Sequence, residues 1–193
     1  MYFRIKRRII LLAFGIVSFL ITYSAGAAVH IGKEQADDLR QHFSEQIKGI
    51  DQNGIFANNA RIALFMFLPA AGIGVGGFVG FNTGLIFTAI AEHSALNNVP
   101  PLVILITPFG IMEVFAYGIA ISRSGLLIYQ LVKLINQIGK KRLGREIIIP
   151  ALIEIGIPAL IEIGIVILIL FAGAMIEWQV ITQFGGVHSV PNI

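Results

Sequence analysis

The sequence predicts an all-α fold, a polytopic bundle of about five transmembrane helices with broken or kinked helices and one external amphipathic helix. Of 193 residues, 56% are hydrophobic and 13% are charged, and the mean hydropathy is +0.83. Soluble domains average about 45–50% apolar and about 25% charged residues. This composition therefore excludes a soluble enzyme and a disordered chain. The chain has no cysteine, which also excludes thiolate chemistry and a disulfide scaffold.

The first predicted element is an N-terminal anchor helix over residues 1–29. A basic run (Arg4, Lys6, Arg7 and Arg8) precedes an apolar run from 9 to 29. Ala25-Gly26-Ala27 also fits a signal-peptide cleavage site. The apolar run is long enough to cross a membrane, so we expect it to be retained.

Residues 30–59 are predicted to hold the amphipathic helix and a turn. The apolar positions of the helix are Leu39, Phe43, Ile47 and Ile50. Charged and polar side chains fill its other face, which is typical of an amphipathic helix. The helix is expected to end at Gly49, and residues 51–54 read as a turn. The apolar stripe either lies on the membrane, docks a partner, or covers the protein's own helices.

Two spans are expected between residues 60 and 96, with a chain reversal between them. The first, 60–80, contains Pro69 and a GxxxG series at Gly72, Gly76 and Gly80, which favours close helix packing over a pore or ligand contact. The reversal is predicted at Asn82-Thr83-Gly84. The segment 81–96 then covers only about 24 Å of a core about 30 Å thick, so it either spans where it is tilted or the bilayer is thinned, or it is re-entrant.

The fourth span, 102–131, is interrupted at Pro108-Phe109-Gly110, where we expect a kink or break. The last span, 147–178, would be about 48 Å long as one helix, so it either protrudes or breaks. Within it, residues 149–156 recur unchanged as 157–164, which places Glu154 and Glu162 on one broad face about 12 Å apart. These acids form a cation-guiding stripe or, as we favour, face solvent or polar neighbours of a lengthened helix. A central acid costs about 2.5–3.5 kcal/mol of insertion free energy, which the Ile- and Leu-rich stretch after Glu162 offsets for one buried Glu, namely Glu162.

The distribution of charge predicts the topology in the cytoplasmic (cell) membrane. Basic residues cluster before the first span and again at Lys133, Lys140, Lys141, Arg142 and Arg145. By the positive-inside rule, both clusters are cytoplasmic, and the amphipathic helix and the tail 184–193 are external. The net charge of +3 comes from these two runs and does not indicate a nucleic-acid partner.

Ionisable residues at membrane depth are the candidate functional residues. They are Glu92, His93, Glu113, Arg123, Glu154, Glu162 and Glu177. They suit a proton or cation path, a metal site, or internal pairing. A single His in the spans, without ligand spacing, disfavours a metal. No catalytic or nucleotide motif is present, so we expect no enzyme activity and no cofactor.

Four blocks in order resemble the stage II sporulation protein M (SpoIIM) family of multi-span membrane proteins. They are Phe56-Ala57-Asn58-Asn59-Ala60-Arg61, Asn82-Thr83-Gly84, Pro108-Phe109-Gly110-Ile111-Met112-Glu113 and Ala172-Gly173-Ala174-Met175-Ile176-Glu177-Trp178. The resemblance covers residues 56–183 and implies a transmembrane core over 60–183. The chain departs from the family pattern at Phe109, where the family usually has His, at the inserted Thr83, and at Gln183, where Pro is frequent.

The resemblance implies that Asn59, Asn82, Gly84, Gly110, Glu113 and Glu177 are the important positions. Such side chains suit bonding to exposed backbone where helices break in the bilayer. The family's namesake is a membrane scaffold in a cell-wall-remodelling complex. By analogy, the chain is expected to be a non-catalytic subunit of a larger complex or a homo-oligomer.

Two other functions stay open. A small transporter or channel would use a path along Glu92, His93, Glu113 and Glu162. An accessory subunit of a membrane oxidoreductase would leave the metal to other chains.

Overall fold

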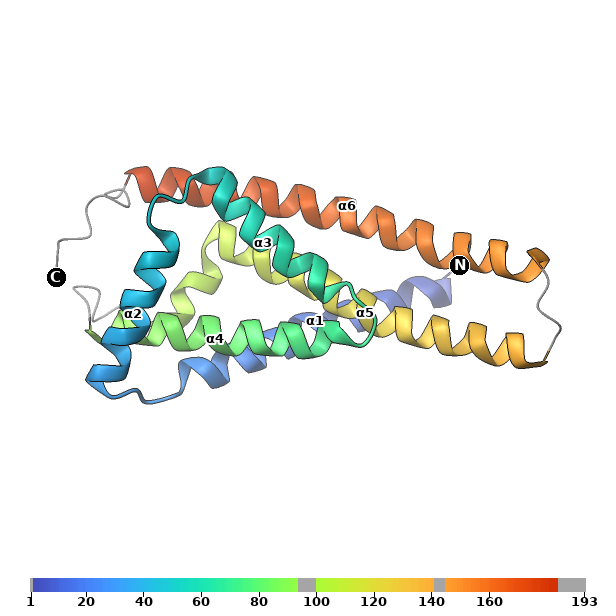
Figure 1. The fold of residues 1–193 in the computed structure, drawn as a ribbon, viewed down its shortest axis with the longest axis horizontal. Coiled ribbons are helices and arrows are strands. Elements are labelled where there is room, and N and C mark those ends of the chain that lie inside the picture. Colours follow the sequence, from blue (N-terminus) through green and yellow to red (C-terminus); the bar gives the residue numbers. More distant parts are fainter. Residues whose placement is uncertain (1, 94–99, 141–144, 184–193) are drawn as a thin grey trace.

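The computed structural model describes residues 2–93, 100–140 and 145–183, and all regular structure in these ranges is helical (Figure 1). The elements are α1 (Tyr2–Ala27), α2 (Lys33–Ile47), α3 (Gln52–Met66), α4 (Ala71–His93), the 3-10 helix η1 (Pro101–Ile106), α5 (Pro108–Lys140) and α6 (Arg145–Gln183). The all-α prediction is confirmed. The predicted tail 184–193 and the basic residues Lys141 and Arg142 lie outside the described residues.

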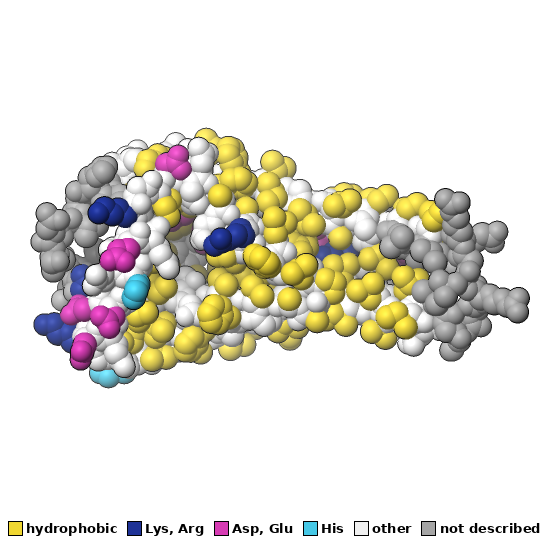
Figure 2. Space-filling model, in the orientation of Figure 1, with side chains coloured by type: hydrophobic (Ala, Val, Ile, Leu, Met, Phe, Trp, Pro, Cys, Tyr) yellow, Lys and Arg dark blue, Asp and Glu magenta, His cyan; other side chains and the backbone are white. Residues whose placement is uncertain are grey.

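Four of the described helices are long and apolar enough to cross a membrane, where about five were expected. The candidate spans are Lys6–Ala27, Ala71–Ala91, Pro108–Asn136 and Ile153–Gln183. Figure 2 shows charged side chains gathered at the end of the molecule that carries α2, and a broad apolar surface over its middle. An apolar surface around long helices is what a bilayer requires, so the chain is a membrane protein.

The helices α1, α4, α5 and α6 run along the long axis of the molecule, and α2 crosses one end (Figure 1). We call this end the α2 end. The helices α1, α4 and α6 finish there and α5 begins there, whereas α5 finishes and α6 begins at the opposite end (Figure 1). The helix α3 starts near the α2 end and packs against α4, α5 and α6.

The predicted spans 60–80 and 81–96 are wrong, because the chain reverses at Phe67–Ala70 and not at Asn82-Thr83-Gly84. Ala70 has a positive φ of 68°, directly after Pro69. The helix α4 then continues through 82–84 without a break. Its polar side chains are satisfied inside the helix: Asn82 Nδ2 donates to Phe78 O at 2.8 Å and Thr83 Oγ1 donates to Val79 O at 2.8 Å.

The predicted turn over 51–54 is instead the start of α3. Asp51 is the N-cap, and its Oδ1 accepts a hydrogen bond from Gly54 N at 2.8 Å. With 15 residues, α3 is about 22 Å long, too short to cross a hydrocarbon core. The helices α3 and α4 therefore form one hairpin, and this explains why the structure has fewer spans than expected.

Glycines set how closely α1 and α4 approach. A Cβ on Gly84 would overlap the Tyr23 carbonyl oxygen, and one on Gly26 would overlap the Phe81 carbonyl oxygen. The packing role predicted for the GxxxG series is confirmed at Gly80 and Gly76, where an added Cβ would overlap Thr22 of α1 and Ile121 of α5. The close approach of α1 and α4 is the main contact of this kind. It also explains why Gly84 sits inside a helix and not in a turn.

The predicted break before Gly110 is confirmed, since η1 ends at Ile106 and α5 begins at Pro108. Between them, Thr107 Oγ1 donates to Ile104 O at 2.6 Å and accepts from Gly110 N at 3.1 Å. The threonine thereby satisfies an amide that the start of a helix leaves free.

The predicted last span is one unbroken helix. Despite Pro150 and Pro158, α6 is continuous over 39 residues, about 58 Å, so it protrudes from a core about 30 Å thick.

The helix α2 is the predicted amphipathic helix. It ends at Ile47, just before Gly49, which has a φ of 75°. Its stripe residue Leu39 packs on a small cluster that includes Ala89 of α4, so α2 covers the protein's own helices.

Candidate functional site

A cavity of about 490 Å³ lies between the helices toward the α2 end. All six α-helices and η1 contribute to its walls. Most of the lining side chains are apolar, and they include Phe43 of α2 and the side chain of Trp178, the chain's single tryptophan. Ligand pockets in proteins share this character, a largely apolar wall with a few polar groups, at about 300–1,000 Å³.

Three polar side chains from three helices meet in this cavity. Asn59 of α3, Glu113 of α5 and Glu177 of α6 all line it. Asn59 Nδ2 donates to Glu113 Oε1 at 2.5 Å. Glu113 and Glu177 thus line one cavity from two helices. We call these three residues the acidic site.

The acidic site has an unsatisfied acceptor. Glu177 Oε2 is buried and has no hydrogen-bond partner in the described part of the chain. Gln130 Oε1 is the other such oxygen among the described side chains, and it does not line the cavity. Buried oxygens without a partner are uncommon and call for an explanation, such as a ligand or water.

The local structure explains why the acidic site forms. Because α3 begins at Gln52, Asn59 lies in its middle, one helical turn from the cavity residues Ile55 and Ile62. Because α5 begins at Pro108, Glu113 comes in its second turn, next to the break. Glu177 lies near the end of α6. The α3 boundary thus moves Asn59 from the end of the predicted external segment 30–59 to the middle of a helix of the bundle.

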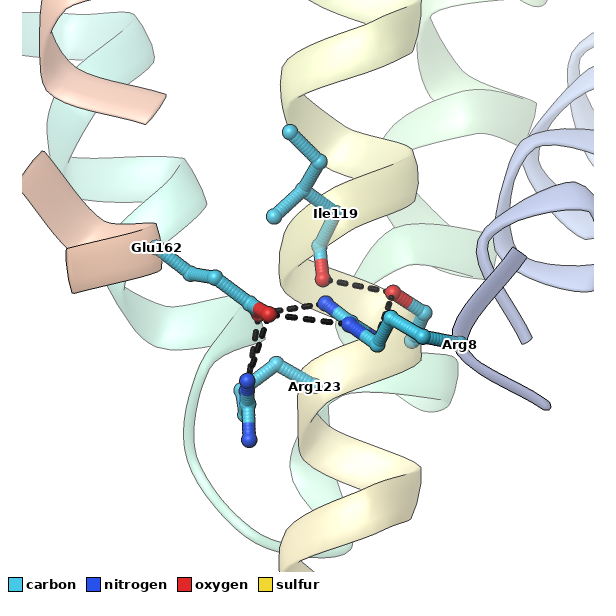
Figure 3. A network of polar contacts seen from close by, with 5 residues as sticks. Arg8, Ile119, Arg123 and Glu162 are labelled. Atoms are coloured by element: carbon cyan, nitrogen blue, oxygen red, sulfur yellow. Dashed lines mark hydrogen bonds and ion pairs between the residues drawn. The ribbon is translucent and has the colours of Figure 1, made fainter. Parts of the chain in front are cut away.

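A second polar cluster joins α1, α5 and α6 farther from α2 (Figure 3). Arg8 Nε donates to Glu162 Oε1 at 2.8 Å, and Arg123 Nε donates to Glu162 Oε2 at 2.7 Å. A second nitrogen of each guanidinium also binds this carboxylate. Such two-point pairing is the strongest form of the Arg–carboxylate contact. Arg123 and Glu162 are therefore paired internally, which was one of the three alternatives for the ionisable residues, and Glu162 is the partly buried acid that insertion energetics predicted.

Three consecutive residues of α5 make hydrogen bonds to three different parts of the chain. Ser122 Oγ accepts from Arg8 of α1 at 2.8 Å, and Arg123 binds Glu162 of α6. Ser124 Oγ donates to Leu68 O at 2.6 Å in the α3–α4 turn. Successive residues on a helix point about 100° apart, so three neighbours can reach three partners. The residues 122–124 are all buried.

The two clusters do not form one path. Glu162 and Glu177 are 15 positions apart on α6, about 22 Å along its axis. Apolar core residues lie between them, including Val166 and Leu170 of α6 and Ala120 of α5. The predicted path along Glu92, His93, Glu113 and Glu162 is therefore not assembled: Glu113 and Glu162 belong to different clusters. Glu92 and His93 end α4, and their side chains lie outside the described part.

The remaining predicted positions belong to neither the acidic site nor the Arg8–Glu162–Arg123 cluster. Gly110 lies at the η1–α5 break and lines the cavity. Asn82 bonds only its own helix, and Gly84 packs on α1. Glu154 is exposed on α6. Of the six positions that the resemblance singled out, Gly110 is the one whose own backbone is bonded at a break.

Sequence reasoning missed Arg8 as a partner of Glu162, because it was counted only as a topology signal. It also missed Ser122 and Ser124. The available signal was the short polar run Ser122-Arg123-Ser124 within an apolar span.

No family model, curated protein or solved structure matches this chain. Within the described ranges, no three His, Asp or Glu side chains come together as a candidate metal-binding group. The geometry of the cavity therefore carries the functional argument.

Proposed function

We propose that the protein is a small membrane transporter that binds a cationic solute in the acidic site. The observation that carries this proposal is the pair of carboxyl groups, Glu113 and Glu177, in one cavity whose described lining contains no basic side chain. Carboxylates removed from water need a counter-charge. In this cavity it must come from a proton or from a bound cation.

Two arginines inside the bundle bind elsewhere. Arg8 and Arg123 both bind Glu162, across the apolar core from the cavity. Arg61 of α3 is exposed and does not line the cavity, so none of these three arginines supplies the counter-charge from within it.

The arrangement of the elements supports movement of the solute as well as binding. Toward the opposite end, the apolar core and the Arg8–Glu162–Arg123 cluster close the bundle. The cavity is bordered by the η1–α5 break and by the α3–α4 hairpin, and broken helices around a mid-membrane site are typical of carriers. Opening the core and the cluster while closing the α2 end would expose the same site to the other side.

The scaffold function, the resemblance to the SpoIIM family and the oxidoreductase subunit stay predictions. The apolar surface of the candidate spans fits lipid, and it would fit the spans of a partner equally well. Native extraction of the tagged chain with mass spectrometry of co-purifying proteins tests these functions. Stoichiometric partners would favour a subunit over a lone transporter.

The transport proposal is tested by charge movement in proteoliposomes on a solid-supported membrane. A panel of protons, Na⁺, K⁺ and quaternary ammonium salts is applied to the full chain and to Glu113→Gln/Glu177→Gln. We expect at least one cation to give a current that the double variant loses. Glu45→Gln changes an exposed carboxylate on α2 and should leave the current intact. Equal currents in empty liposomes and in liposomes with folded protein would overturn the proposal.

A further inference from the structure

We infer that the acidic site takes an organic cation with a bulky apolar or aromatic body, in preference to a bare metal ion. This deepens the proposed function by naming the substrate class, and it rests on that function for the role of the cavity. The inference follows from the walls of the cavity, its polar groups and its size, which agree on one kind of ligand.

The walls are rich in aromatic rings. Those lining the cavity are Phe19, Tyr23, Phe43, Phe87, Phe109, Tyr117 and Trp178. Apolar and aromatic walls gain free energy by covering apolar ligand surface. The faces of Trp and Tyr rings also attract cations, and quaternary ammonium groups are bound in this way.

The polar groups gather in one part of the cavity. Asn59 already holds one oxygen of Glu113, while Glu177 Oε2 is buried and unpaired. Trp178 follows Glu177 directly in the chain and lines the same cavity. An alkylammonium head placed at Glu177 would meet a carboxylate and an indole ring together.

A bare metal ion fits these groups poorly. Ca²⁺ takes six to eight oxygen ligands and Mg²⁺ takes six, several of them water. The acidic site offers two carboxyl groups and one amide, and that amide nitrogen is directed at Glu113. A volume of about 490 Å³ also greatly exceeds what an ion needs. An anion is disfavoured because both ionisable groups of the site are acids.

The single tryptophan provides a direct test. Trp178 is the chain's only tryptophan and it lines the cavity, so the protein's tryptophan emission reports on this site. The full chain in lipid nanodiscs is titrated with benzyltrimethylammonium, sodium and benzenesulfonate. We expect a saturable emission change with benzyltrimethylammonium alone. A response to sodium of similar affinity, a response to benzenesulfonate, or no saturable response to the aromatic cation would overturn the inference.

Two variants test whether the aromatic cation binds at Glu177. Glu177→Gln removes the charge but keeps the shape, and we expect it to weaken benzyltrimethylammonium binding by about tenfold, because the quaternary ammonium, which has no N–H to donate, loses its Coulombic attraction to the carboxylate. Glu45→Gln is the matched control and should bind like the wild type. Size-exclusion elution and helical circular dichroism confirm that each variant is folded. Unchanged affinity in folded Glu177→Gln would overturn the placement of the cation at Glu177.

The outcome is separable from that of the transport proposal. Saturable binding of the aromatic cation without any current would overturn the transport proposal and support the inferred ligand class. A proton or sodium current with no binding of the aromatic cation would support transport and overturn the inferred ligand class.

Discussion

Glu162 is a single carboxylate that binds two arginines, Arg8 and Arg123, whose side chains are 25% and 4% exposed. Replacing it by Gln leaves two guanidinium groups facing each other in the bundle. Breaking a buried ion pair costs about 3–5 kcal/mol. Because Arg8 is partly exposed, we expect Glu162→Gln to lower the free energy of unfolding by about 3 kcal/mol, measured by denaturant titration in mixed micelles.

The duplication supplies a matched control for this change. Glu154 stands in the same eight-residue sequence as Glu162 but is exposed. Glu154→Gln should change stability by less than about 0.5 kcal/mol, as exposed substitutions do. Equal effects of the two variants would show that the Arg8–Glu162–Arg123 cluster contributes little to stability.

Ser124 fixes the α3–α4 turn through a fully buried hydroxyl. It donates to Leu68 O and accepts from Gly72 N at 3.1 Å. Ser124→Ala leaves both backbone groups without that partner, and an unsatisfied buried group costs about 1–3 kcal/mol. We expect a loss in this range in the same titration. Ser44→Ala removes an exposed hydroxyl from α2 and should have almost no effect; similar losses for both would contradict the assigned role.

At the scale of elements, the contact between α1 and α4 depends on glycine. A Cβ on Gly84 would overlap backbone atoms of Tyr23 and Ala27, which cannot move aside as a flexible side chain can. We expect Gly84→Ala to cost about 1–3 kcal/mol through overpacking. Thermal melts in detergent, followed by size-exclusion chromatography, measure this.

Gly74, on the same helix, is the control. No atom lies within 4 Å of a Cβ added there. Alanine forms helices better than glycine by about 0.8–1.0 kcal/mol, so Gly74→Ala should be neutral or stabilising. A stabilising Gly84→Ala would mean that α1 and α4 are farther apart than described.

The break before α5 could be predicted from the sequence, but the position of the α3–α4 reversal could not. The break before α5 carries both Pro108 and Gly110, and it was predicted correctly. The reversal after α3 carries Pro69, but the glycines that follow resembled the interior of a span. Asn82-Thr83-Gly84 has turn-forming residues, yet side-chain bonds to the preceding turn and packing on α1 keep it helical.

The two polar clusters could also be predicted only in part. Glu113, Glu177 and Glu162 could be identified because acids are rare at membrane depth. Their partners could not, since Arg8 and Glu162 are 154 positions apart and no local pattern relates them. The cavity needs walls from every described helix, so only tertiary structure reveals it.

At the scale of the whole molecule, described basic residues of the two predicted cytoplasmic clusters lie toward the same end. The start of α1, with Lys6 and Arg7, lies toward the end where α5 finishes, and Lys133 is on the last part of α5. Arg7 also lies over the Tyr129 ring of α5, with its guanidinium carbon 4.3 Å from the ring centroid. The acid-rich α2 is at the other end (Figure 1). We propose that the α2 end is external and the opposite end is cytoplasmic.

This orientation is open to a direct test because the chain has no cysteine. Ser44→Cys on α2 and Asn136→Cys near the end of α5 each introduce one exposed thiol. In intact cells, a membrane-impermeant maleimide should label Ser44→Cys, and it should label Asn136→Cys only after permeabilisation. The reverse labelling pattern would mean that the α2 end, and the cavity near it, face the cytoplasm. Since the cavity lies toward the α2 end, the expected labelling would mean that a cation reaches Glu113 and Glu177 from outside, and that release inward requires the Arg8–Glu162–Arg123 cluster to open.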